Sequence, residues 1–252
     1  MKLTKAHQDF KNKYGFVNHV NFNVFKNWAT QNKFSLKSLF PTVKRTAAHP
    51  IDLSTTTNFI GGIEEFNNIP FFQRKIDALQ KQVPNKIITG GYLEKRALYT
   101  SNLYLREIEG TVDRRNTHLG VDFWLPEATP VHAFLNGQVV GIANNNQHKG
   151  YGGVIILKHT FTNFSFYTLY GHNTVASVFK HKIGDFIKKD QQIAILADAK
   201  ENGDWAPHLH FQVMLTLLDY KNDFPGVAFE SEVAIWKTIC PNPNLLFQLE
   251  GF

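Results

Sequence analysis

Apolar and polar residues alternate between His208 and Leu215, where every second side chain is apolar. A period of two is typical of a half-buried β-strand, because successive side chains of a strand point to opposite faces. Such a strand presents His208 and His210 on one face. Its opposite face is wholly apolar and would fix the register.

The stretch from His118 to Trp124 predicts a strand that bends. Gly120, Val121, Phe123 and Trp124 are poor helix formers, and the last three are good strand formers. A straight strand would separate His118 from Asp122 by about 13 Å, whereas ligands of one metal ion lie a few ångströms apart. A shared role therefore requires a bend, which Gly120 permits at little cost.

Helical spacing occurs near both ends of the chain. Apolar residues recur every three or four positions at Phe72, Ile76, Leu79 and Val83, and more weakly at Phe10, Tyr14 and Val17. Residues 219–226 read as a loop, and residues 232–239 as a short helix. We expect helices before and after a strand-rich middle.

Composition indicates a globular protein with a sizeable core, since 43% of the residues are hydrophobic and 13% aromatic. Cys240 is the only cysteine, which excludes an internal disulfide framework and a thiolate metal cluster. The N-terminus has no apolar core of an export signal, and no run is long enough to span a membrane. We expect a cytoplasmic protein if the chain is complete, and an extracytoplasmic one if an export signal was removed.

Charge is distributed unevenly. Residues 1–100 hold 15 basic and 6 acidic residues, whereas residues 101–252 hold 12 and 15, giving balances of +9 and −3. The basic region could attract an anionic partner, although such an excess also serves solubility alone. No nucleic-acid-binding motif accompanies it.

Three short motifs carry the candidate chemistry. Residues 118–122 read His-Leu-Gly-Val-Asp, residues 169–172 Leu-Tyr-Gly-His, and residues 208–211 His-Leu-His-Phe. Four histidines and a carboxylate suffice for a catalytic zinc site with three protein ligands, a position for water and two further imidazoles. The chain has 11 histidines, so some clustering is expected by chance; His132 and His159, beside strand-like runs, are expected to be structural.

The order of these motifs resembles that of the lysostaphin-type, LytM-like zinc metalloendopeptidases, which cut peptide bonds in bacterial peptidoglycan. The similarity covers roughly residues 112–216. Residues 128–140 resemble the strand pair after the first motif, residues 151–159 the next strand, and residues 182–193 the hairpin before the last motif.

The resemblance implies an α+β fold with a mainly antiparallel β-sheet metallopeptidase core, a helical N-terminal region and a short C-terminal helical extension. We expect a basic, partly helical region over residues 1–91, the peptidase domain over residues 92–218, and the extension over residues 219–252.

The resemblance also implies roles for the motif residues. His118, Asp122 and His210 would bind one Zn²⁺ per chain. His208 would transfer protons, and His172 would steady the attacking water or the oxyanion. Both are chemically sensible because imidazole exchanges protons near pH 7.

Substrate-binding candidates are Tyr170, Asn202 and Trp205, with ordinary strand packing as the alternative for Tyr170. The segment from Leu196 to Pro207 has one glycine and a tryptophan where the family usually has a glycine- and serine-rich loop. Gln212 stands where glutamate is common. These departures argue against assuming cleavage of pentaglycine bridges, and favour a soluble peptide or muropeptide substrate over intact wall.

Two functions follow. The first is a zinc-dependent endopeptidase that hydrolyses peptidoglycan-derived or D-amino-acid-containing peptides through a metal-activated water. The alternative is a non-hydrolytic, peptidase-like binding or regulatory module. Degenerate relatives of that kind generally lose ligands, and this sequence keeps all five groups, which favours the enzyme.

Overall fold

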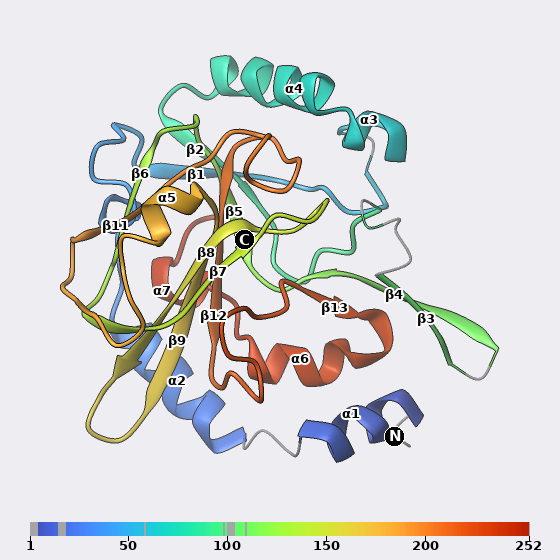
Figure 1. The fold of residues 1–252 in the computed structure, drawn as a ribbon. Coiled ribbons are helices and arrows are strands. Elements are labelled where there is room, and N and C mark those ends of the chain that lie inside the picture. Colours follow the sequence, from blue (N-terminus) through green and yellow to red (C-terminus); the bar gives the residue numbers. More distant parts are fainter. Residues whose placement is uncertain are drawn as a thin grey trace.

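An eight-stranded sheet forms the centre of the computed structural model, which describes residues 5–14, 19–57, 59–97, 99, 104–108 and 110–251. Its strands, in spatial order, are β1 (Ala47–Ile51), β2 (Lys86–Gly90), β5 (Val121–Trp124), β12 (His208–Met214), β9 (Ser165–Asn173), β8 (Gly152–Thr160), β7 (Gly137–Asn145) and β10 (Phe186–Ile187) (Figure 1). The β1–β2 pair is parallel, and the remaining neighbours are antiparallel.

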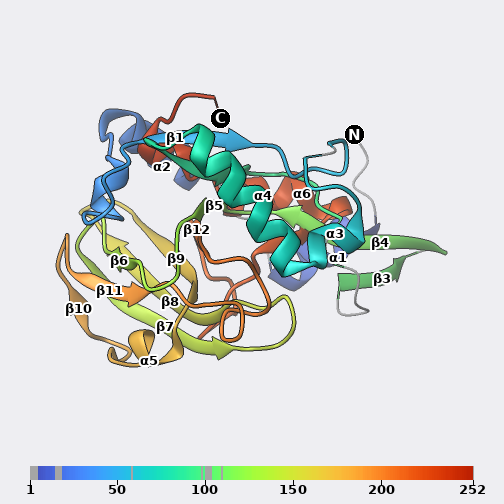
Figure 2. The ribbon, with the colours of Figure 1, turned by 90° about the horizontal axis from the view of Figure 1, so that it is seen from above.

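Two smaller sheets adjoin this one. The first pairs β11 (Gln192–Ile195) with β6 (Pro130–His132), and the second has the order β13 (Val227–Phe229), β4 (Thr111–His118), β3 (Leu105–Ile108). The hairpin of β3 and β4 projects from the body (Figures 1 and 2). The expected hairpin over residues 182–193 is not formed, because β10 pairs with β7 and β11 pairs with β6.

Helices pack around the sheet. They are α1 (Lys5–Tyr14), α2 (His19–Gln31), α3 (Ile63–Asn67), α4 (Ile69–Gln82), α5 (Val175–Val178), α6 (Val233–Ile239) and α7 (Asn244–Phe247), with 3₁₀ turns η1 (Leu36–Ser38) and η3 (Glu230–Glu232). Helices α3 and α4 cover the β1–β2 end, whereas α1, α2 and α6 lie on the opposite side (Figure 1).

Local sequence explains α4. The Asn68 side chain accepts a hydrogen bond from Phe71 N and caps the first turn, where Pro70 is tolerated because no intrahelical hydrogen bond requires its missing N–H. Phe72 and Ile76 are buried, which confirms the spacing prediction. The predicted helix over residues 232–239 is confirmed by α6, and the one around Phe10 by α1; Val17 lies outside the described residues.

The core has parts on both faces of the sheet. On one face Phe123, Phe211 and Leu209 pack with Phe25 of α2 and Phe247 of α7. Aromatic and aliphatic side chains of α3 and α4 pack at the edge around β2 and β5. The predicted α+β class is confirmed.

Strands β1 and β2, from the N-terminal region, extend the same sheet as β5. The domain boundaries near residues 91 and 218 remain a prediction. In the described part of the chain, no helix is both long and apolar enough to cross a membrane.

Candidate metal centre

A bent strand brings the first motif to the last. Strand β4 ends at His118 and β5 begins at Val121, so the predicted bend at Gly120 is confirmed. A Cβ on Gly120 would lie 2.7 Å from the His210 ring, and glycine therefore permits the close approach. Strand β12 runs antiparallel to β5 with His210 opposite Asp122.

Three side chains converge at this bend. His118 Nε2 lies 2.9 Å from His210 Nδ1, and each nitrogen lies 3.2 Å from Asp122 Oδ1. A tetrahedral zinc ion with bonds of about 2.0–2.2 Å would place its ligands about 3.3 Å apart. The side chains of His118, Asp122 and His210 thus form a buried triangle of nearly the size that a metal ion requires.

The outer nitrogens of both imidazoles are held by oxygen acceptors. His118 Nδ1 lies 2.8 Å from Gly91 O, and His210 Nε2 lies 2.9 Å from Gln212 Oε1. Gln212 Nε2 donates to Pro225 O, which sets the amide orientation. Because these oxygens accept, the outer nitrogens carry the protons and the inner nitrogens present lone pairs. Gln212 thus supplies the acceptor that the family's glutamate would supply.

The surroundings of the Asp122 carboxylate show whether the triangle fits a cation. Its Oδ1 is buried and has no hydrogen-bond donor among the described residues, although imidazole nitrogens surround it. Burial alone would raise the pKa of Asp122, but His118, once its ring is protonated at low pH, and the guanidinium of Arg96 hold the pKa well below its usual range. A buried anionic oxygen facing two inward lone pairs fits a divalent cation.

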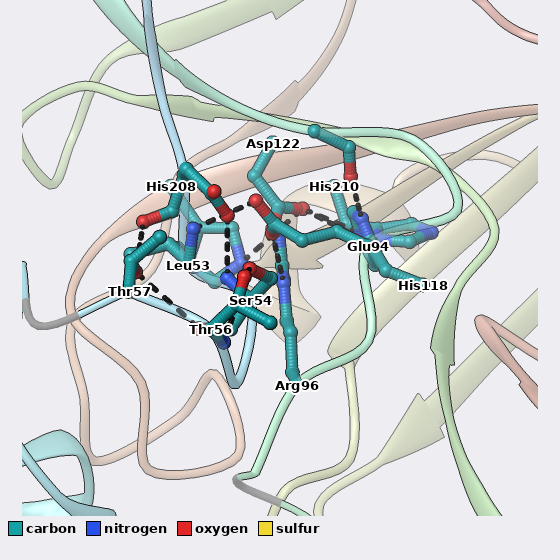
Figure 3. A network of polar contacts seen from close by, with 12 residues as sticks. Leu53, Ser54, Thr56, Thr57, Glu94, Arg96, His118, Asp122, His208 and His210 are labelled. Atoms are coloured by element: carbon teal, nitrogen blue, oxygen red, sulfur yellow. Dashed lines mark hydrogen bonds and ion pairs between the residues drawn. The ribbon is translucent and has the colours of Figure 1, made fainter.

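The other carboxylate oxygen is held by a buried network that sequence reasoning missed. Arg96 donates to Asp122 Oδ2 over 2.6 Å and to Glu94 Oε2 over 2.6 Å, and Glu94 Oε1 accepts from Leu53 N over 2.7 Å. Figure 3 shows these contacts from Leu53 to Asp122. Arg96 is 3% exposed, so the network fixes the carboxylate from behind.

Two further imidazoles lie beside the triangle. The rings of His172 and His208 are 4.2 Å apart, and His208 Nε2 is 3.7 Å from Asp122 Oδ1. His208 Nδ1 lies 2.7 Å from Ala206 O, and His172 Nδ1 lies 2.9 Å from Asn202 O. Burial lowers the pKa of His208 to about 4 and that of His172 well below its ordinary value. Both rings are therefore neutral at pH 7.

The expected substrate residues fall in different places. Trp205 lines the cavity at the centre, and its ring packs against His172 and His208. Asn202 does not line it: its amide bonds the backbone of Trp205, and its carbonyl holds His172. Tyr170 is buried in the core against Phe211. Asn202 therefore positions His172 and Trp205, and Tyr170 packs in the core. Neither has the expected contact with substrate.

The cavity has a volume of about 230 Å³. The motif histidines and Asp122 line one part of it. Leu53, Phe66, Ile69 and Phe72, all from the first 91 residues, line another, together with Trp124. The N-terminal region therefore supplies an apolar wall beside the candidate metal centre.

The three motifs lie within a segment that matches a known family model. Residues 116–221 match the model of peptidase family M23, which confirms the resemblance predicted from the motifs. The lipoprotein YgeR of Escherichia coli (strain K12), itself uncharacterized, is 33% identical over 94 residues, covering 37% of this chain and 33% of its own. The match thus spans only a third of that relative's length.

Two solved structures are also similar. The catalytic domain of lysostaphin, an antimicrobial peptidase from Staphylococcus simulans, is 27% identical, with 62% of this chain and 96% of that chain covered and a TM-score of 0.37. A zinc-containing peptidase from Vibrio cholerae is 24% identical, with 50% and 40% covered and a TM-score of 0.33.

Proposed function

With the match to peptidase family M23 as premise, we propose that this protein is a zinc-dependent endopeptidase acting on peptidoglycan-derived or D-amino-acid-containing peptides. The observation that carries the proposal is the donor-less Asp122 Oδ1, which faces lone pairs of His118 and His210. These three residues would hold one zinc ion per chain.

A bound zinc ion would lower the pKa of a water molecule and polarise the peptide carbonyl. His208 is placed to take the proton of that water, because its Nδ1 proton is engaged by Ala206 O and its Nε2 lone pair faces the centre. It would then return the proton to the leaving amine. Stacking on Trp124, with ring centres 5.5 Å apart, helps to fix the His208 ring.

His172 has a narrower role than the resemblance alone implies. Its Nδ1 proton is engaged by Asn202 O, so Nε2 can accept a hydrogen bond but cannot donate one while the ring is neutral. We therefore assign His172 to orienting the attacking water instead of stabilising an oxyanion.

We also propose an extracytoplasmic location. The support is the family match and the relative described as a lipoprotein. Both agree with a substrate derived from the cell wall, and they favour the second of the two locations considered from the sequence.

The experiment combines metal content with product analysis. Zinc is measured by plasma mass spectrometry, and hydrolysis of soluble muropeptides, intact sacculi and pentaglycine is followed by mass spectrometry. We expect one zinc per chain and cleavage of muropeptides, with little release from sacculi. A zinc-loaded protein that cleaves none of the three would overturn the proposal in favour of a binding module.

A further inference from the structure

The cavity beside the candidate metal centre has a second charged region, formed by Lys149 and Arg115. Both side chains line the cavity, and Lys149 is only 6% exposed. In the part of the chain that the structure describes, neither forms an ion pair with a carboxylate. A buried cation without an anionic partner is costly unless a ligand supplies one.

Lys149 keeps hydrogen-bonding capacity for such a ligand. Its ammonium donates to Asp204 O over 2.7 Å and lies 4.4 Å from the centre of the Trp205 ring. An ammonium group has three N–H donors, and the carbonyl uses one. Burial lowers the pKa of Lys149 to about 8, partly offset by Asp204, so the group is mainly charged at neutral pH.

Arg115 lies on the same wall. Its guanidinium is 5.9 Å from the centre of the Tyr104 ring, and the Tyr104 hydroxyl donates to Lys149 O over 3.0 Å. Arg115 Nε donates to Val227 O. Tyr104 therefore links the backbone of Lys149 to the side chain of Arg115 at this part of the cavity.

Asp122 and Asp223 line the cavity, and in the described part of the chain neither forms an ion pair with Lys149 or Arg115. Asp122 is engaged by Arg96. Asp223 accepts from Asn145 Nδ2 over 2.7 Å; burial raises the pKa of Asp223, and its hydrogen bonds and the charge of Arg115 offset part of that rise. The wall around Lys149 and Arg115 therefore favours an anionic ligand.

This charged region is close to the proton-transferring histidine. The centre of the Trp205 ring lies 6.0 Å from that of His208 and 4.4 Å from the Lys149 ammonium. The ammonium is therefore within about 10 Å of the His208 ring, and an extended peptide advances about 3.3–3.6 Å per residue. A carboxylate on Lys149 would belong to a residue within roughly three positions of the scissile bond.

We propose that Lys149, in the cavity that Arg115 also lines, binds a carboxylate of the substrate, so that the enzyme selects acidic peptides over the corresponding amides. The inference rests on the proposed peptidase function and names its substrate class.

The test uses one set of soluble muropeptides in two forms, with free carboxyl groups and after conversion of these groups to amides. Hydrolysis and binding are measured for the wild type, Lys149→Met, Lys149→Arg and Lys188→Met. Lys188 is exposed and does not line the cavity, so its substitution removes the same charge outside the proposed site. We expect the wild type to cleave the acids about ten- to a hundredfold faster, the usual worth of a hydrogen bond to a charged group.

Lys149→Met should abolish this preference by slowing cleavage of the acids alone, whereas Lys149→Arg and Lys188→Met should keep it. The ratio of the two rates is unaffected by partial loss of folded enzyme, which lowers both. The carboxylate site is overturned, while the peptidase function stands, by either of two results. One is an acid-to-amide rate ratio in Lys149→Met equal to that of the wild type. The other is a loss of the preference in Lys149→Arg as large as in Lys149→Met. If zinc-loaded wild type cleaves neither form, the peptidase function fails; tighter binding of acids by wild type than by Lys149→Met then supports the site, and equal binding overturns it.

Discussion

His159 is a buried histidine like His118 and His210 of the candidate metal centre, but its hydrogen bonds differ from theirs. His159 on β8 has both nitrogens engaged, with Nδ1 2.8 Å from Asn136 O and Nε2 2.8 Å from Thr168 Oγ1. His118 and His210 each have one nitrogen held by an oxygen, while the other points at Asp122 Oδ1. Burial is equal, so the free lone pairs distinguish the candidate ligands from the structural histidine.

Asp122→Ala should have the largest effect, because it removes the one anionic group of the triangle. We expect loss of most of the zinc and a fall in turnover beyond the 10²–10⁴-fold that a lost acid–base residue costs. Metal content and hydrolysis of muropeptides check this. Full zinc occupancy in Asp122→Ala would show that the ligand assignment is wrong, and His159→Gln serves as the control that should keep its zinc.

His208→Ala and His172→Ala should separate catalysis from metal binding. Both variants should retain zinc and lose roughly two to four orders of magnitude in turnover. Metal content and hydrolysis of muropeptides are again the measurements. Equal loss of metal in His208→Ala and His210→Ala would mean that both histidines of the last motif are ligands.

The local pattern was enough to predict the strand of the last motif and the bend at Gly120. These depend on alternation and on backbone freedom, which neighbouring residues determine. Arg96 could not be predicted, because its partner Asp122 lies 26 residues away and nothing in Glu94-Lys95-Arg96 distinguishes a buried charge from an exposed one. Asn202 was placed in the correct loop, but its side chain faces the loop backbone.

Arg96→Gln tests whether the ligand Asp122 depends on the buried residues that hold its other oxygen. The change leaves Asp122 Oδ2 and Glu94 without their buried cation, so the carboxylate is less firmly oriented. We expect zinc affinity, measured by competition with a chelator, to fall about 10–100-fold. The neighbouring Lys95→Gln breaks only an exposed ion pair with Glu230 and should leave affinity unchanged; equal weakening in both variants would contradict the role of Arg96.

The effect expected at His159 concerns stability alone and leaves zinc binding and turnover unchanged. Burial lowers the pKa of His159 to about 4, against about 6.5 in an unfolded chain. Between these values the unfolded state binds more protons, so His159 stabilises the fold above about pH 6.5, and this contribution of about 3 kcal/mol is lost as the pH falls toward 4.

His159→Gln cannot titrate. The free energy of unfolding of metal-free wild type should therefore exceed that of the variant most at pH 7, and the difference should shrink by pH 4.5 in urea titrations. The histidines of the metal centre contribute equally to both proteins and cancel, so a difference that stays constant with pH would show that His159 has an ordinary pKa.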